Sequence, residues 1–542
     1  MKKWLILSIV WIFCYQYTYS QTVLKLDDFG WSHLKTGAER ARVLYEIQNE
    51  AVLTNTPVDY SGISVIDLEI TSDFKSIPLL GCEDFKHIVF NVTNNAKDVK
   101  LFSLVGGLEN IEVEKKLLDG KYFGKIKAFK GREILLVIKD NNPWVDNRTG
   151  YDYGHYRKDV LLIRNAKSLN SVINTYNNCF SDPICSYCVV SPNVKYVRNF
   201  TINRVEGSTY KTSCIEVKAQ SHVVISNIKI NTPDSDLYGD YAILIRDCAD
   251  ITLRDIEING TYSQSNKYGY GIHIDNVWNI LFENVKGVAR WGVMGTKNVS
   301  NITLLNCALN RFDIHCYGKD VYLKNCTIDG GKKGWYCGGT SIYGTIQYDS
   351  CTFINCNPIR YTESYKTSVG AEVIFNDCIF YASSSKNSIF YTGALYEEEN
   401  TRNEVSKKCL PNITINNMKI IIPSGLNKIC LYDIGRQSNQ GTDIPYKDKV
   451  GYINKIRIGG LTIVQDNPND ELAFEIFSEP ILSENKIKLQ IIDSKLKNTS
   501  IINTVMTTNN KSSILIKNTI FDDIQEEKDF VKIRIKDCSR EK

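Results

Sequence analysis

ITLRDIEI, at residues 251–258, is one copy of a short pattern that recurs along most of the chain. In each copy apolar and polar residues alternate, and a turn-forming residue, most often Asn or Asp, stands at the fifth place. Alternation with a period of two residues predicts β-strands rather than helices. The clear copies are KYVRNFTI (195–202), VVISNIKI (223–230), ITLRDIEI (251–258), ILFENVKG (280–287), ITLLNCAL (302–309), VYLKNCTI (321–328), IQYDSCTF (346–353) and VIFNDCIF (373–380).

The fifth-place residue recurs every 19–29 residues over these eight copies, and looser copies follow them. Such an interval suits one coil of a solenoid, whose apolar residues stack on the next coil. Asn tolerates left-handed backbone angles and can bond the Asn of the neighbouring coil. We therefore predict an all-β fold, a single-stranded right-handed parallel β-helix. The fifth-place residues are Asn199, Asn227, Asp255, Asn284, Asn306, Asn325, Ser350, Asp377, Asn417, Gly460, Asp493 and Asn518.

The regions before the repeats have separate roles. Residues 35–53 carry apolar residues at helical spacing, and we interpret them as an N-terminal helix that caps the first coil, because an open sheet edge invites aggregation. The expected division is a signal peptide at 1–20, a cap region at 21–54 and the β-helix at 55–542. Within the β-helix we expect a long loop near 142–159 and looser coils toward the C-terminus.

The N-terminus has the pattern of an export signal. Lys2 and Lys3 precede an apolar run, and the small residues around Ser20 suit a signal peptidase, so we expect cleavage after Ser20. The run is short for a bilayer and no other stretch approaches the required length, so no membrane span is expected. The expected location is the periplasm or the medium of a bacterium.

Cysteine use is high for the expected compartment, with 17 Cys in the chain. Four of them directly follow the fifth-place residue in successive copies, and we interpret these as a buried stack of small apolar thiols rather than a metal site. Cys185 and Cys188 have CxxC spacing without a second pair nearby, which favours a local disulfide or a plain loop. The stacked residues are Cys307, Cys326, Cys351 and Cys378.

The composition excludes several classes of protein. With 43% apolar and 11% aromatic residues among 542, the chain is not intrinsically disordered as a whole. Lys and Arg number 65 and Asp and Glu 61, a net charge of +4. This small balance gives no argument for a nucleic-acid partner, and an anionic ligand would have to meet a local patch of cations. We expect a monomer.

Strand parity locates a candidate site. In FDIHCY (312–317) and GIHID (271–275) the apolar residues are expected to point inward and the polar residues outward. Two imidazoles and two guanidiniums would then lie within about 10 Å, since stacked strands are about 4.8 Å apart. The candidate catalytic residues are His315, His273, Arg311, Arg290 and Tyr317, and the candidate substrate-binding residues are Asp313, Tyr241, Tyr270, Trp291 and Trp335.

A simpler interpretation stands beside this one. A single outward His on a strand is usually a solvated surface residue, and Arg311 with Asp313 would be an exposed ion pair of little energetic weight. Because His315 and His273 are expected to face outward, their replacement by Ala is expected to leave thermal stability nearly unchanged.

A family resemblance rests on NCALNRFDIHCYGKDVYLKNCTI (306–328) with NRTGYDYGHYRKD (147–159). These segments resemble a group of bacterial and phage β-helix proteins associated with acidic-polysaccharide cleavage. An exported β-helix with a helical cap looks like the pectate-lyase-like superfamily, and lyases acting on chondroitin-type glycosaminoglycans are the nearest resemblance. It implies a polysaccharide lyase that cleaves a uronic-acid-containing substrate, such as chondroitin sulfate or hyaluronan, by β-elimination. The GHG motif of polygalacturonases is absent from the chain.

β-Elimination requires that the uronate carboxylate be neutralised, the C5 proton removed and the leaving oxygen protonated. We assign the first task to Arg290 and Arg311, the second to His315 assisted by His273, and the third to Tyr317. No metal or other cofactor is required, although calcium at the Asp234–Asp240 loop stays an open alternative. Two other functions stay open: a glycoside hydrolase that pairs Asp313 with Asp275 or Asp240, and a non-catalytic glycan-binding surface protein.

Overall fold

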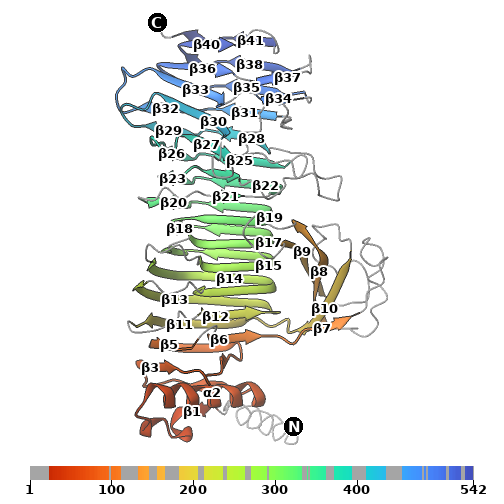
Figure 1. The fold of residues 1–542 in the computed structure, drawn as a ribbon, viewed down its shortest axis with the longest axis vertical. Coiled ribbons are helices and arrows are strands. Elements are labelled where there is room, and N and C mark those ends of the chain that lie inside the picture. Colours follow the sequence, from red (N-terminus) through yellow and green to blue (C-terminus); the bar gives the residue numbers. More distant parts are fainter. Residues whose placement is uncertain are drawn as a thin grey trace, which may run out of the picture.

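The computed structural model of the chain is an elongated parallel β-helix, which confirms the predicted fold (Figure 1). Its coils stack from an N-terminal helix at one end to the last strands at the other. The structure describes residues 23–96, 99–111, 132–145, 155–164, 182–205, 213–235, 241–262, 270–289, 292–331, 338–339, 342–361, 371–392, 411–434, 455–478, 481–483, 486–503, 505–507, 512–526 and 532–540.

Each coil contributes parallel strands to three faces, and each strand pairs with its equivalent in the next coil. Face 1 carries the candidate site. It consists of β4 (Ile77–Pro78), β6 (Lys100–Val105), β12 (Ser213–Lys218), the first parts of β14 (Ile243–Tyr262), β15 (Tyr270–Glu283), β17 (Gly292–Leu305) and β19 (Phe312–Lys324), and then β21 (Gly338–Gly339), β24 (Ile359–Tyr361), β27 (Ser388–Thr392), β30 (Lys428–Ile434), β33 (Leu472–Phe477), β36 (Thr499–Asn503) and β40 (Asp523–Glu526).

Face 2 follows a turn at the end of face 1. It consists of the first parts of β5 (Cys82–Asn94), β11 (Lys195–Arg204) and β13 (Ser221–Ser235), the middle of β14, the later parts of β15, β17 and β19, and then β22 (Ile342–Asp349), β25 (Glu372–Asn376), β28 (Asn412–Asn416), β31 (Lys455–Gly459), β35 (Lys488–Ile492), β38 (Ser513–Lys517) and β41 (Lys532–Lys536).

Face 3 closes each coil. It consists of β3 (Val65–Ile70), the later parts of β5, β11, β13 and β14, and then β16 (Lys286–Val288), β18 (Ala308–Leu309), β20 (Thr327–Asp329), β23 (Thr352–Ile354), β26 (Ile379–Tyr381), β29 (Lys419–Ile422), β32 (Thr462–Gln465), β39 (Ile520–Phe521) and β42 (Ser539–Arg540). Two short parallel pairs lie outside the three faces: β1 (Leu24–Lys25) with β2 (Val58–Asp59), and β34 (Ile481–Ser483) with β37 (Val505–Thr507).

The turn between faces 2 and 3 is made by the fifth-place residue of the repeat. All twelve predicted positions have positive φ angles, between 48° for Asn518 and 66° for Gly460. Asn side chains at this place bond the equivalent residue one coil away: Asn227 Nδ2 donates to Asn199 Oδ1 at 2.7 Å, and Asn284 Nδ2 donates to Asp255 Oδ1 at 2.6 Å. Asp537, also at positive φ, is a thirteenth member that the sequence pattern did not reveal.

The inside of the solenoid is a continuous apolar core. The predicted cysteine stack is confirmed, since Cys307, Cys326, Cys351 and Cys378 are all buried and free. Cys185 and Cys188 are also free, and both belong to a strand rather than to a loop or a disulfide. Burial raises the pKa of each of these two thiols to about 11, which argues against reactive thiolates.

The predicted cap helix is confirmed as α2 (Gly37–Thr54), which follows the 3₁₀ turns η1 (Leu26–Phe29) and η2 (Trp31–His33). Thr36 and Glu39 form a capping box at its N-terminus, and Asn55 at positive φ ends it. Its apolar side, with Leu44 and Ile47 fully buried, packs on β3 and β4. The first coil is thereby covered.

A four-stranded antiparallel sheet, hereafter the side sheet, stands beside the middle coils (Figure 1). Its strand order is β7 (Glu109–Ile111), β10 (Pro183–Val190), β8 (Glu133–Val145) and β9 (His155–Arg164). Both ends of the segment predicted as a loop, 142–159, belong to strands, because β8 continues to Val145 and β9 begins at His155. Residues 146–154 lie outside the described part of the chain, as do residues 1–22, which include the predicted signal peptide.

Replacement of Asn227 should separate the two contributions of the turn residue. Asn227→Gly keeps access to the positive φ of 53° but removes the 2.7 Å bond to Asn199, and should cost about 1 kcal/mol. Asn227→Ala should cost about 1–2 kcal/mol more, because a Cβ strains left-handed backbone. Denaturant unfolding of both variants measures the difference. Equal stability of the two variants would contradict the backbone argument.

Strand β5, near the N-terminal end of the solenoid, should carry a pH-dependent contribution to stability. Burial raises the pKa of the Glu83 carboxyl to about 7, although the backbone N–H groups of Leu80 and Gly81 lower it by donating to the carboxylate. Folding thus favours the protonated carboxyl. The stability that this preference contributes is fully present below the ordinary pKa of 4.5 and is lost as pH rises through about 7. Between pH 4.5 and 8 the free energy of unfolding should fall by about 3 kcal/mol more in the unchanged protein than in Glu83→Gln. Thermal midpoints of both proteins across this range test the prediction.

Candidate functional site

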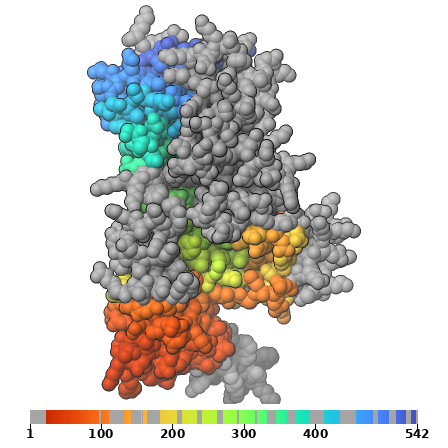
Figure 2. Space-filling view, viewed as in Figure 1, coloured from red at the N-terminus to blue at the C-terminus, as the bar shows by residue number. Residues whose placement is uncertain are grey.

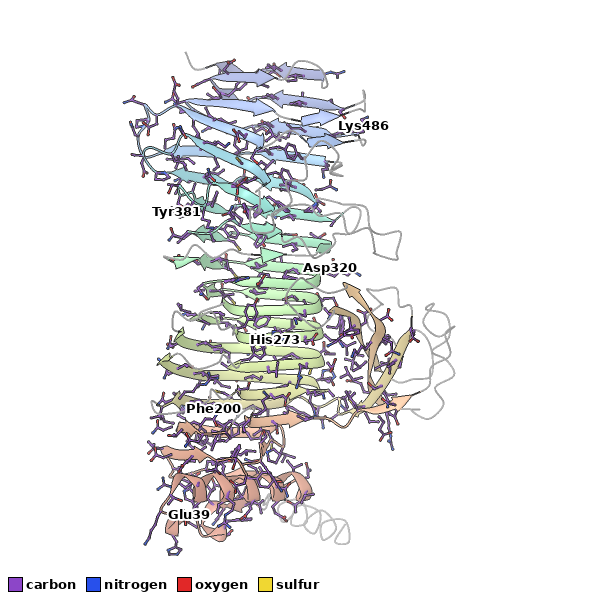
Figure 3. All side chains as sticks on the ribbon, in the orientation of Figure 1. Glu39, Phe200, His273, Asp320, Tyr381 and Lys486 are labelled. Carbon is purple, nitrogen blue, oxygen red and sulfur yellow. The ribbon has the colours of Figure 1, made fainter. Side chains whose placement is uncertain are left out.

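Two columns of outward residues run along face 1 at the middle of the solenoid, where Figure 3 labels His273. Parallel register stacks His273, Gly295 and Asp313 in three successive coils, and we call this the His273 column. Two residues further along each strand is the Asp275 column, which contains Lys218, Arg246, Asp275, Lys297 and the backbone of His315. The predicted parity holds for the inward neighbours Ile272, Ile274, Phe312 and Ile314, all buried.

His273 lies between two tyrosine rings. The Tyr241 ring is stacked on the imidazole, with centroids 4.3 Å apart and planes 14° apart. The Tyr270 ring is also nearly parallel to the imidazole, at 6.1 Å and 21°. These contacts help to leave His273 only 7% exposed and hold the plane of its ring.

Tyr270 and Arg311 meet at one carboxylate oxygen. The Tyr270 hydroxyl donates to Asp313 Oδ2 at 2.6 Å, and Arg311 Nη2 donates to the same oxygen. The Arg311 guanidinium carbon is 6.0 Å from the Tyr270 ring centroid. Arg311 and Asp313 are 4% and 2% exposed, so their ion pair is buried, and removing one partner would leave an uncompensated charge.

Two glycines of β17 make room for this arrangement. A Cβ on Gly295 would lie 2.5 Å from two atoms of the Tyr270 ring, closer than real Cβ contacts allow. A Cβ on Gly292, whose φ is 144°, would lie 2.9 Å from the Cβ of Arg311. Gly295 was not among the predicted site residues, although a glycine inside a strand is a known sign of close approach by another group.

Asp275 is held by a residue from the side sheet. Lys158 Nζ of β9 is 2.6 Å from Asp275 Oδ2, and Asn298 Nδ2 donates to Asp275 Oδ1 at 3.3 Å. Burial acts to raise the pKa of the Asp275 carboxyl, but Lys158, together with the neighbouring His273 and Lys297, lowers it below its ordinary value. Burial raises the pKa of the neighbouring Asp247, which accepts a bond from Asn276. Sequence reasoning missed Lys158 as a site residue.

The structure brings together five of the predicted site residues: Tyr241, Tyr270, His273, Arg311 and Asp313. They lie on the outer face, but Tyr241 is half-buried and the other four are buried, because Tyr241 stacks on His273 and both Tyr270 and Arg311 bond Asp313. Replacing His273 should therefore cost stability, contrary to the prediction. Arg290, Trp291 and Trp335 lie outside the described residues, and so do the side chains of His315 and Tyr317.

The backbone of β19 departs from regular pairing just beyond Asp313. His315 pairs with Lys297, but the next paired residue is Gly318 opposite Val299, so β19 has an extra residue here. Bulges of this kind re-aim side chains and are common beside active sites. Simple parity therefore does not extend from His315 to Tyr317.

Within the described residues, no three His, Cys, Asp or Glu side chains gather as a metal site would require. The predicted alternative calcium loop, Asp234–Asp240, falls outside the side chains that the structure describes. No helix among the described residues is both long and apolar enough to cross a membrane.

Two solved structures share this fold. The tailspike protein gp49 from Pseudomonas phage LKA1 is 15% identical with a TM-score of 0.55, over 92% of this chain and 81% of that chain. The Gp54 tailspike of Acinetobacter baumannii bacteriophage AP22, in complex with A. baumannii capsular saccharide, is 11% identical with a TM-score of 0.53, over 92% and 79%. No protein-family model and no curated protein matches the sequence. At these identities the likeness shows the fold alone.

Proposed function

We propose that this protein is an exported enzyme that cleaves a uronic-acid-containing polysaccharide at the His273 column by β-elimination. The observation that carries the proposal is the buried contact of Tyr270, Arg311 and Asp313 beside a stacked imidazole on the outer face of the solenoid. Aromatic rings suit the faces of sugars, and a guanidinium suits a uronate carboxylate. The capsular saccharide bound to the AP22 tailspike shows that such a fold can hold a glycan.

Each step of the elimination has a proposed group. Arg311, with Arg290, neutralises the uronate carboxylate and so acidifies the C5 proton. A neutral imidazole, His315 assisted by His273, takes that proton. The electron pair forms the C4–C5 double bond, the C4–O bond breaks, and the leaving oxygen takes a proton from a phenol. Tyr317 is the proposed donor, and Tyr270 is a second candidate because its hydroxyl is held by Asp313.

The candidate carboxylates favour the lyase over the hydrolase alternative. A hydrolase needs one carboxyl group with a raised pKa to act as acid. Lys158 lowers the pKa of Asp275, and Asp313 Oδ2 is already bonded by both Tyr270 and Arg311. Asp240, the other predicted partner, lies outside the described residues.

Glycosaminoglycans such as chondroitin sulfate and hyaluronan are the proposed substrates.

The reaction type can be read directly from its product. Incubation with a panel of acidic polysaccharides should yield ultraviolet absorbance, because elimination leaves an unsaturated uronate, and chelator should not abolish it. New reducing ends without absorbance would favour the hydrolase. Binding without any cleavage would favour a glycan-binding protein, and loss of activity in chelator would reject the metal-free mechanism.

Replacement of His273 should reduce kcat by about a hundredfold or more. His273→Ala should also lower the thermal midpoint, because the imidazole fills the space between two rings. Tyr241→Phe keeps the ring that stacks on the imidazole, so its thermal midpoint should fall less than that of His273→Ala. An active, folded His273→Ala variant would exclude a catalytic role.

Gly295→Ala should inactivate the enzyme, although Gly295 itself carries no catalytic group. Its Cβ would meet the Tyr270 ring at 2.5 Å, so the ring must move and its bond to Asp313 is lost. Tyr270→Phe removes the same bond but leaves the ring in place. If the bond to Asp313 matters, both variants lose activity; if only ring position matters, Gly295→Ala alone does. Full activity in both would contradict the proposed site.

A further inference from the structure

One face of the β8–β9 hairpin packs on the solenoid where face 1 turns into face 2, and we call it the hairpin face. Its residues follow from the register, in which Leu135 pairs with Leu162, Val137 with Val160 and Lys139 with Lys158. The apolar pairs pack with Ala219, Ala249 and Trp278 of the solenoid. In a strand every second residue points to the same side, so the hairpin face continues beyond the apolar pairs with Lys139, Lys158 and Tyr156.

The polar end of the hairpin face reaches the Asp275 column. Lys158 Nζ is 2.6 Å from Asp275 Oδ2, and β9 contacts β14, β15 and β17. Opposite Lys158, the exposed Lys139 holds its ammonium 4.5 Å from the centroid of the Tyr156 ring. In Figure 2 the orange and yellow atoms of the side sheet stand beside the green atoms of the middle coils.

Cations outnumber carboxylates around this contact. The Asp275 column and the hairpin face together carry five cations, listed below, whereas the nearby acids are Glu216, Asp247 and Asp275. Glu216 is paired with Arg246, Asp275 is paired with Lys158, and Asp247 accepts a bond from Asn276. The whole chain carries only +4, so this is a local concentration of positive charge. The cations are Lys139, Lys158, Lys218, Arg246 and Lys297.

We propose that the hairpin face and the Asp275 column together bind anionic sugar units of the polysaccharide, next to the units that react at His273. The proposal rests on the proposed function and adds a second binding surface to it. Lys139 and Lys297 contact the carboxylate or sulfate groups, as ammonium groups do. Lys158 is a positioning residue, because its bond to Asp275 fixes the hairpin face against the solenoid.

The test compares two double variants with the same change in charge. Lys139→Gln with Lys297→Gln should raise KM about tenfold and weaken its dependence on salt, with a much smaller effect on kcat. Lys286→Gln with Lys324→Gln removes two lysines whose side chains are exposed elsewhere on the coils, and should leave KM unchanged. Equal KM values in the two variants would overturn the proposal.

Direct binding keeps this test independent of cleavage. Chondroitin sulfate and alginate are the probes, and neutral dextran is the control, each titrated at low and high salt. The Lys139/Lys297 variant should bind both polyanions about tenfold more weakly than the Lys286/Lys324 variant. If the wild type cleaves nothing but this difference appears, the proposed function fails and the binding surface stands. If the wild type binds neither polyanion at low salt, the binding surface is rejected.

The role of Lys158 needs a pair of variants, because Lys158→Gln leaves Asp275 with a buried charge and can destabilise the contact. Lys158→Gln with Asp275→Asn removes both charges. If Lys158 positions the hairpin, both variants weaken binding of chondroitin sulfate and increase proteolysis of the side sheet. Unchanged binding and proteolysis in the double variant would refute the positioning role.

Discussion

The left-handed turn between faces 2 and 3 sets the geometry on which the rest of the molecule depends. A residue at positive φ bends the chain at the same place in each coil that carries the repeat within the described residues, and Asn side chains such as Asn227 and Asn284 bond the equivalent residue one coil away. Asn and Asp can do both, which explains their recurrence at this place. With the turn fixed, every strand falls in register with its neighbour, and residues far apart in sequence become vertical neighbours.

The site is a product of that register. His273, Gly295 and Asp313 come from three different coils, yet parallel pairing stacks them in one column. The middle residue lacks a side chain, so the Tyr270 ring can cross it and reach Asp313 in the coil beyond. A rigid sheet thereby holds a phenol, a guanidinium and a carboxylate together without a loop, which is the kind of support that preorganised catalytic groups need.

The sequence was enough to predict the solenoid, its turn residues and the cap helix, because each depends on a local pattern that repeats. It was enough to place His273 and Asp313 on the outer face, since strand parity is also local. It did not reveal that these residues are buried. Tyr241 covers His273 and Tyr270 reaches Asp313 through contacts between coils, while Arg311 bonds Asp313 from two residues earlier in the same coil. Lys158 was missed for a similar reason: only the docking of a hairpin more than a hundred residues away in sequence brings it to Asp275.

The docking of the side sheet is itself a matter of charge as well as apolar packing. At the base of the sheet His222 of β13 lies between two carboxylates, with Nε2 bonded to Glu133 of β8 and Nδ1 3.1 Å from Asp250. At the other end of the same hairpin Lys158 is bonded to Asp275. The apolar contact with Ala219, Ala249 and Trp278 of the solenoid is made by the same hairpin face. Since the contacts at both ends are partly buried, they restrict how the hairpin can sit, and apolar packing alone is not directional. The position of Lys139 and Tyr156 beside face 1 is thus determined by the same polar contacts that hold the sheet in place.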